Sequence, residues 1–185
     1  TLAWTRNGEH WTRDRASFFD RHPQKGAWDH AHAWVDEQLL VGDEVYLYYG
    51  GYKSGHKVNR FEERQIGLVK MKRDRYVARE AGAEGGSFRT PLLKLDAGTM
   101  TLNLEAPVGE VTVQILDRDG QPLRGFRRSD CRKISGDALA APVRWKRSLS
   151  ALKGKPVRLE FFLENARLFS FDLLGTSGQG PAERK

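Results

Sequence analysis

The sequence lacks several features that would place it in a well-marked class. It has one cysteine, Cys131, so no internal disulfide can form and a disulfide-stapled small fold is excluded. It has no apolar run near the roughly 18 residues of a membrane-spanning helix, and we expect no membrane partner. Helical periodicity is nearly absent. We therefore expect an all-β protein without a transmembrane helix.

Sequence motifs of the common enzyme classes are also missing. The chain has no Walker or Rossmann glycine pattern, no His-Glu-x-x-His and no Gly-x-Ser-x-Gly. Cys131 has cations beside it, Arg132 and Lys133, which would lower the pKa of a thiol. It has no adjacent histidine or asparagine partner, so we do not expect it to be a nucleophile.

The net charge of +7 invites comparison with nucleic-acid-binding proteins. Acidic residues are mixed with the basic ones along the whole chain, so the excess is thinly spread. The densest basic segment, Arg124 to Lys133, is interrupted by Asp130. We interpret it as a solvated loop and expect no nucleic-acid partner.

The first 72 residues have the pattern of short β-hairpins. Asn7-Gly8 separates two short apolar segments and favours a tight hairpin turn. A second hairpin is predicted around Gly42-Asp43, and residues 66–71 form a further short strand. Four of the five tryptophans lie in this part. A sheet with so few strands is poorly stable alone. This part of the chain therefore either docks on another sheet or is a remnant of a larger sheet.

Residues 73–174 have longer alternating segments. Val111, Val113 and Ile115 predict a strand with one buried and one wet face, and residues 157–163 predict another. Residues 88–95 and 99–104 are predicted to pair across Asp96-Ala97-Gly98. About eight antiparallel strands indicate a β-sandwich of the jelly-roll or concanavalin-like type. Residues 175–185 hold glycine, serine, proline and charge, which predicts a disordered tail.

The order of these segments resembles part of a known family. Trp4 to Trp11, W-T-R-N-G-E-H-W, is similar to the "S-x-D-G-x-x-W" hairpin of five-bladed β-propeller glycosidases, including glycoside hydrolase families 32, 43 and 130. Residues 41–51, V-G-D-E-V-Y-L-Y-Y-G-G, resemble inner strands of a following blade. Residues 66–77 resemble the closing strand of that blade, and residues 85–171 resemble a C-terminal β-sandwich found in some relatives.

The resemblance implies three parts: residues 1–72 as the last one to one and a half blades, residues 73–174 as the sandwich, and residues 175–185 as the tail. It implies an oligosaccharide or polysaccharide ligand, and upstream blades or another chain as partners. It also favours an extracytoplasmic location. A propeller pocket needs several blades to converge, so we expect a carbohydrate-associated module that is not catalytic alone.

The same resemblance places Asp29 near the start of an inner strand, as the candidate catalytic acid, although a turn or capping residue is the simpler interpretation. The candidate sugar-contacting residues are Trp28, His30, His32, Trp34 and Tyr52. Aromatic rings stack on the apolar faces of sugars, and polar side chains bind the hydroxyl groups. His30 and His32 would share a face if both lay on one strand.

No metal site or cofactor is expected. The two neighbouring histidines lack a third ligand nearby. Asp117-Arg118-Asp119-Gly120 has part of a calcium-loop pattern without its later ligands, so we interpret it as a hairpin turn. A structural calcium elsewhere has no motif in its favour.

Two alternative functions stay open. In the first, the chain supplies part of a glycoside hydrolase active site that missing blades or another chain complete. In the second, it is a basic polyanion-binding protein that uses the Arg124–Lys133 loop.

Overall fold

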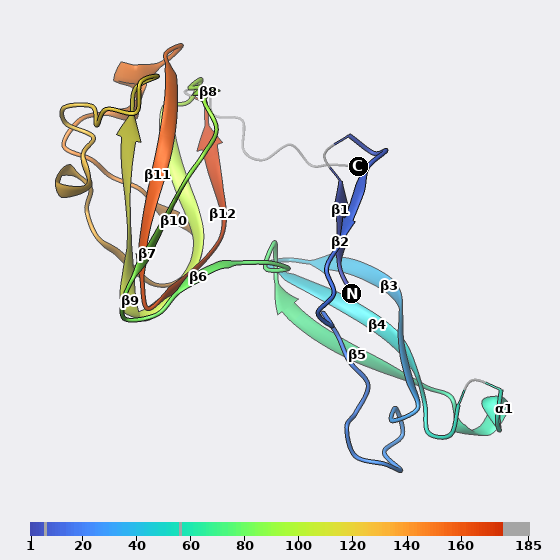
Figure 1. Cartoon of the computed structure of the whole chain (residues 1–185). Helices are drawn as coiled ribbons and strands as arrows, with labels where there is room; N and C mark the ends of the chain where they lie inside the picture. The colour runs from blue at the N-terminus through green and yellow to red at the C-terminus, as the bar shows by residue number, and fades with distance from the viewer. Residues whose placement is uncertain (6, 56, 176–185) are drawn as a thin grey trace. The chain divides into compact units, whose positions relative to one another are not determined.

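A computed structural model describes residues 1–5, 7–55 and 57–175 of the chain, without the side chain of residue 60. The chain divides into two compact units, Thr1–Arg73 and Asp74–Lys185. The regular structure of each unit is almost all antiparallel strand, and the described helices are single short turns (Figure 1). The all-β prediction is confirmed. The predicted tail lies, from residue 176 onward, outside the described residues.

The first unit contains a small hairpin and a three-stranded meander (Figure 1). The predicted hairpin forms, but the tight Asn7-Gly8 turn is wrong: Thr5 and Trp11 are the last paired residues, and the Asn7 side chain accepts the Glu9 and His10 N–H groups in a wider loop. Gly8 lies in this loop at φ +78°, and Gly42-Asp43 joins the first two meander strands as predicted. The elements are β1 (Ala3–Thr5), β2 (Trp11–Arg13), β3 (His32–Val41), β4 (Glu44–Tyr52), α1 (Arg60–Glu63) and β5 (Gln65–Lys72).

β4 is the central strand of the meander and carries most of the core of this unit. Val45, Leu47 and Tyr49 alternate along one face and are buried. β3 is an edge strand, and every residue from Trp34 to Val41 is exposed. The apolar side chains of β3, Val35, Leu39, Leu40 and Val41, therefore have no cover within the described part of this unit.

The strands of the second unit join into one seven-stranded sheet that curls into a half-barrel (Figure 1). Its path is β6-β12-β9-β11-β7, with β10 beside β9 and β8 beside β11. The elements are β6 (Arg79–Ala81), β7 (Gly86–Arg89), β8 (Leu93–Lys94), β9 (Thr99–Leu116), η1 (Arg128–Asp130), β10 (Ile134–Pro142), η2 (Leu149–Leu152), β11 (Pro156–Glu164) and β12 (Ala166–Leu174).

The long strand β9 produces the curl because it pairs with two successive strands. Its first part pairs with β12, from Thr99↔Leu174 to Glu105↔Arg167, and its last part pairs with β11. At the bend, a Cβ on Gly109 would lie 2.0 Å from the Glu164 carbonyl oxygen. Only glycine lets β9 approach the β11–β12 turn this closely.

The core of the second unit lies on the concave side of the sheet. Val111, Val113 and Ile115 are fully buried, as the alternation predicts. The residues that the sequence predicted to share one face of β11 are buried too: Val157, Leu159, Phe161 and Leu163. Alternation at period two thus identified the core residues of both central strands correctly.

Two expectations for this unit are wrong. Residues 88–95 do not pair with residues 99–104, because β7 and β8 both pair with β11 instead. Thr112 was expected to face water but is only 4% exposed. The loop after β9 crosses this outer face, where Arg128 packs over the Phe162 ring and its backbone N–H donates to Gln114. The loop therefore covers a face that alternation alone predicts to be solvated.

Candidate functional site

The candidate residues of the first unit lie around the end of β4. Successive side chains of a strand point to opposite faces of the sheet. Tyr49 and Gly51 therefore lie on one face, and Gly50 and Tyr52 lie on the other. The predicted site residues divide between these two faces.

Asp29 and Trp28 pack on the Tyr49 face. The Tyr49 hydroxyl donates to Asp29 Oδ2 at 3.0 Å, and the Trp28 ring stacks on the Tyr49 ring with centroids 5.5 Å apart. A Cβ on Gly51 would lie 2.3 Å from the Trp28 ring, so the small residue gives that ring its place. Asp29 is 7% exposed, which puts its carboxylate in the interior of the unit.

The environment of this buried pair affects Tyr49. Burial raises the pKa of Tyr49 from its usual 10.0 to about 12, and the hydrogen bond to Asp29 and the nearby carboxylate charge act in the same direction. The Oδ1 atom of Asp29 has no hydrogen-bond partner among the described residues. Asp29 is thus a buried acceptor that is only half satisfied.

The opposite face has a cluster of three aromatic side chains. The Trp34 ring lies 5.3 Å from the His32 ring and 6.2 Å from the Tyr52 ring, measured between centroids. Sheet register explains the grouping, because His32 pairs with Tyr52 and Trp34 pairs with Gly50. Tyr52 is buried and Trp34 is 48% exposed, so Trp34 presents the accessible ring of the cluster.

An ion pair lies next to these rings. Arg64 Nη2 is 3.2 Å from Asp36 Oδ2, and the Arg64 guanidinium also lies 5.8 Å from the centroid of the Tyr52 ring. A Cβ on Gly50 would lie 3.2 Å from Arg64 and 3.3 Å from Asp36, so this pair crosses the sheet above Gly50. His32, Trp34, Tyr52, Asp36 and Arg64 together form what we call the Trp34 face.

Sequence reasoning missed Asp36 and Arg64. Asp36 lies at a bulge in β3, where the register shifts between Val35 and Glu37. This extra residue turns Asp36 toward Gly50 although simple alternation would not place it there. Arg64 follows a short helical turn in a polar loop. The one sequence feature that could have indicated room for these two side chains is Gly50, which pairs with Trp34 and has no side chain to fill this face.

His30 does not join either group. It lies before β3, and its ring nitrogen Nδ1 is 3.0 Å from the His22 carbonyl oxygen. The expectation that His30 and His32 share a strand face is wrong, because only His32 lies on the strand. Within residues 1–5, 7–55 and 57–175, no group of three or more His, Cys, Asp or Glu side chains has metal-binding geometry.

Cys131 differs from the sequence-based electrostatic expectation. Burial raises the pKa of its thiol, although Arg132 and Lys133 follow it in sequence. Its sulfur accepts a hydrogen bond from the Val113 N–H at 3.4 Å. Cys131 is therefore a packed core residue, and the desolvation of its sulfur outweighs the opposing effect of the Val113 hydrogen bond on its pKa.

Comparison with known proteins gives no relative for this chain: no protein-family model, curated protein or solved structure matches it. The likeness to propeller glycosidases therefore stays a prediction. Among the described helices, none is long and apolar enough to cross a membrane.

Proposed function

We propose that this chain is a carbohydrate-associated module that binds neutral glycans through the Trp34 face and is not catalytic alone. In this proposal, the first unit is the last part of a five-bladed β-propeller of the glycosidase type, and the second unit is its appended β-sandwich. The observation that carries the proposal is the exposed Trp34 ring with an ion pair of accessible side chains beside it.

The Trp34 face has the two kinds of group that sugar recognition uses. An exposed indole ring offers an apolar surface for the C–H face of a pyranose or furanose ring. The Asp36 and Arg64 side chains are 54% and 51% exposed, so water reaches both. A carboxylate accepts hydrogen bonds from sugar hydroxyl groups and a guanidinium donates to them, which together fix the orientation of a stacked ring.

The exposed apolar side chains of the first unit support the proposal that a further blade packs against it. Of the fifteen large hydrophobic side chains that are exposed among the described residues, eleven lie in this unit. Val35, Leu39, Leu40 and Val41 are a group of these on the edge strand β3. The register divides them between the two faces of this edge strand, and the proposal assigns their cover to the adjacent blade.

The burial of Asp29 supports the absence of activity in the chain alone. Glycoside hydrolysis generally needs two carboxyl groups, about 5 to 9.5 Å apart, that flank an accessible glycosidic bond. Asp29 is enclosed by Trp28 and Tyr49 and is 7% exposed, so a sugar has no direct access to its carboxylate. In the alternative proposal, further blades would rearrange this corner and supply the second acid.

Tryptophan fluorescence and calorimetry with neutral oligosaccharides test the binding proposal. Fructo-, xylo- and manno-oligosaccharides are titrated into the full chain, into Trp34→Ala and into Trp11→Ala. Trp11 is the matched control because it is 63% exposed and lies on β2, away from the Trp34 face. We expect at least one oligosaccharide to bind, Trp34→Ala to weaken it about tenfold or more, and Trp11→Ala to bind normally.

The same preparations separate the two proposals. No binding of any of these sugars, or equal losses in both tryptophan variants, would refute glycan binding at the Trp34 face. Hydrolysis of aryl glycosides or fructans is measured in parallel. Turnover by the chain alone that disappears in a folded Asp29→Asn variant would replace the module proposal with the hydrolase alternative.

A further inference from the structure

The second unit gathers most of the net charge of the chain into one region. Residues 124–147 hold eight Lys or Arg and two Asp, a surplus of six, while the whole chain has a net charge of +7. The fold brings the segment 124–133 against the segment 144–147, because Cys131 pairs with Trp145 in a β-bridge. The eight cations, which we call the basic patch, are Arg124, Arg127, Arg128, Arg132, Lys133, Arg144, Lys146 and Arg147.

The backbone beneath the basic patch is held in place by several interactions. The Arg132 N–H donates to the Arg144 carbonyl at 2.9 Å, and the Lys146 N–H donates to the Asp130 carbonyl at 3.1 Å. Phe126 is fully buried and anchors the middle of the loop in the core. The cations therefore extend from a fixed backbone, which lowers the entropy cost of binding a ligand.

Asp130 joins the two segments and balances one of the cations. Its carboxylate lies 2.8 Å from Lys146 Nζ and accepts the Arg127 N–H at 3.1 Å. This hydrogen bonding holds the pKa of Asp130 below its usual value. Asp130 thus acts as a support for the loop and neutralises Lys146, which leaves the nearby arginines to determine the local charge.

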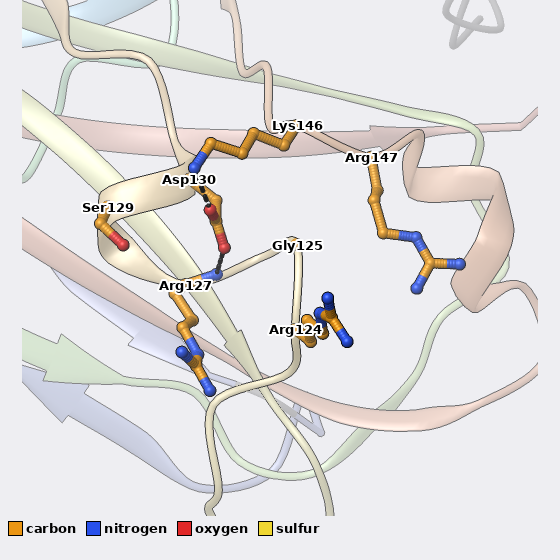
Figure 2. Close-up of a pocket in the computed structure, with 7 residues that line it drawn as sticks. All are labelled: Arg124, Gly125, Arg127, Ser129, Asp130, Lys146 and Arg147. Atoms are coloured by element: carbon orange, nitrogen blue, oxygen red, sulfur yellow. Dashed lines mark hydrogen bonds and ion pairs between the residues drawn. The ribbon is translucent and has the colours of Figure 1, made fainter.

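A hollow of about 640 Å³ lies at this junction and is lined by Arg124, Arg127 and Arg147, together with the Asp130–Lys146 pair (Figure 2). The guanidinium groups of the three arginines have no dashed contact in Figure 2, and they have no carboxylate partner among the described residues. A Cβ on Gly125 would lie 2.4 Å from Arg147 Cδ, so the glycine lets the stem of Arg147 lie across the loop.

We propose that this hollow binds a sulfate group of an acidic polysaccharide, and that the rest of the basic patch binds further sulfates along the same polymer. The three guanidinium groups, of which that of Arg147 packs on the Phe126 ring, supply planar pairs of donors for a tetrahedral oxyanion. A neighbouring hollow is lined by Arg132 and Arg144, and a third by Arg128 and Lys133. Lys133 is paired with Glu110 at 2.7 Å, so Arg128, Arg132 and Arg144 supply the further positive charge beside the first hollow.

The aromatic residues near the basic patch favour a sulfated polysaccharide over a single-stranded nucleic acid. Single-stranded nucleic acids are held by exposed rings on which bases stack. Phe126 is buried beneath Arg147, and the Trp145 ring is half-buried with its Nε1 donating to the Val113 carbonyl at 2.7 Å. The described residues of the patch therefore supply charge without a stacking surface. The site is separate from the Trp34 face and does not depend on it.

Binding to dextran sulfate tests the proposal, with neutral dextran and duplex and single-stranded DNA as competing ligands. The test variant is Arg124→Gln/Arg127→Gln/Arg147→Gln in the full chain. The matched control is Arg15→Gln/Lys25→Gln/Lys57→Gln, which removes the same charge from exposed positions in the first unit. Affinities are measured at several salt concentrations, because the slope counts the ionic contacts.

We expect dextran sulfate to bind in a salt-dependent manner and neutral dextran not to bind to this site. The test variant should lose at least about tenfold in affinity and reduce the salt slope by roughly three contacts, while the control stays close to the parent chain. Equal losses in both variants would refute a defined site, because they would show attraction by net charge alone. The proposal would also be overturned if DNA bound as tightly as dextran sulfate, or if dextran sulfate did not bind at low salt. If neutral oligosaccharides failed to bind the Trp34 face, the expected binding of dextran sulfate to the basic patch would be unchanged.

Discussion

The hydroxyl of Tyr49 lies 3.0 Å from Oδ2 of Asp29, and this contact joins the segment before β3 to the centre of β4. Trp28 stacks over Tyr49, and Phe19 meets the same ring edge-on with centroids 4.7 Å apart. Tyr49 is thus a centre of contact between the irregular N-terminal segment and the sheet, together with the Ala31 N–H bond to the Tyr52 carbonyl. Stability of this unit should depend strongly on the state of that side chain.

Tyr49 should make the first unit sensitive to alkaline pH. The pKa of Tyr49 in the folded chain is raised to about 12 from a usual 10.0, so the folded state holds this proton more tightly than the unfolded state. The stabilisation is fully present below pH 10 and is lost as pH rises through about 12. Burial also raises the pKa of Tyr76, so an absorbance titration of the tyrosines should show a late transition of which Tyr49→Phe removes the Tyr49 part.

The same variant tests the energetic role of the hydrogen bond. Tyr49→Phe leaves the buried Asp29 carboxylate without its described donor, so we expect a loss of about 1 to 3 kcal/mol in unfolding free energy. Tyr48→Phe is the matched control, because Tyr48 is half-buried on the opposite face of the same strand. Chemical denaturation monitored by circular dichroism measures both. Equal stability of the two variants would contradict a supporting role for the Tyr49–Asp29 bond.

Gly109 should be essential for the bend of the second unit. A Cβ at this position would lie 2.0 Å from the Glu164 carbonyl oxygen and 2.4 Å from the Asn165 carbonyl oxygen, and neither backbone atom can move aside easily. Gly109→Ala should therefore cost at least about 2 kcal/mol. Gly82→Ala, where an added Cβ meets nothing within 4 Å, should be near neutral. Thermal unfolding of the two variants gives the comparison, and similar melting temperatures would contradict the close approach.

The parts of the fold that the sequence predicts are those encoded locally. Gly42-Asp43 forms a two-residue turn and Asn7-Gly8 lies in the loop of the first hairpin, because backbone preferences act within a few residues. The alternation from Val111 to Ile115 gives the buried face directly. The pairing of β7 with β11 was not predicted because it joins Phe88 to Phe161, far apart in sequence, and no local pattern specifies such a partner.

The candidate sites also divide into parts that local sequence encodes and parts that depend on long-range contacts. Trp34 and Tyr52 were predicted from their residue types and lie together because β3 and β4 form a local hairpin. The sequence identified Arg124 to Lys133 as the densest basic segment and left polyanion binding by this loop open, but it did not predict that residues 144–147 join it. The high local charge arises because the backbone hydrogen bond between Arg132 and Arg144 places two separate basic segments side by side. Only the fold reveals such a concentration of charge.

Cys131 should be chemically inert in the folded chain. Burial raises the pKa of its thiol, so the reactive thiolate is scarce at neutral pH. We expect slow labelling by a thiol-specific disulfide reagent in buffer and fast, complete labelling in denaturant. Because this is the single cysteine of the chain, the reaction reports on one site without any variant. Fast labelling of the native chain would show that the loop around Cys131 opens readily.

The exposed apolar side chains of β3 should make the first unit self-associate. Leu40 is 62% exposed on an edge strand, where it lies beside Leu39 and Val41, and edge strands with such surfaces pair with other chains. Leu40→Lys should shift the chain toward monomer in sedimentation experiments over a range of concentrations. Val108→Lys, which alters an 85% exposed residue at the β9 bend in the second unit, is the control and should leave association unchanged. A chain that stays monomeric at every concentration, or equal effects of both variants, would show that β3 is not the associating surface, and would weaken the argument that an adjacent blade covers it.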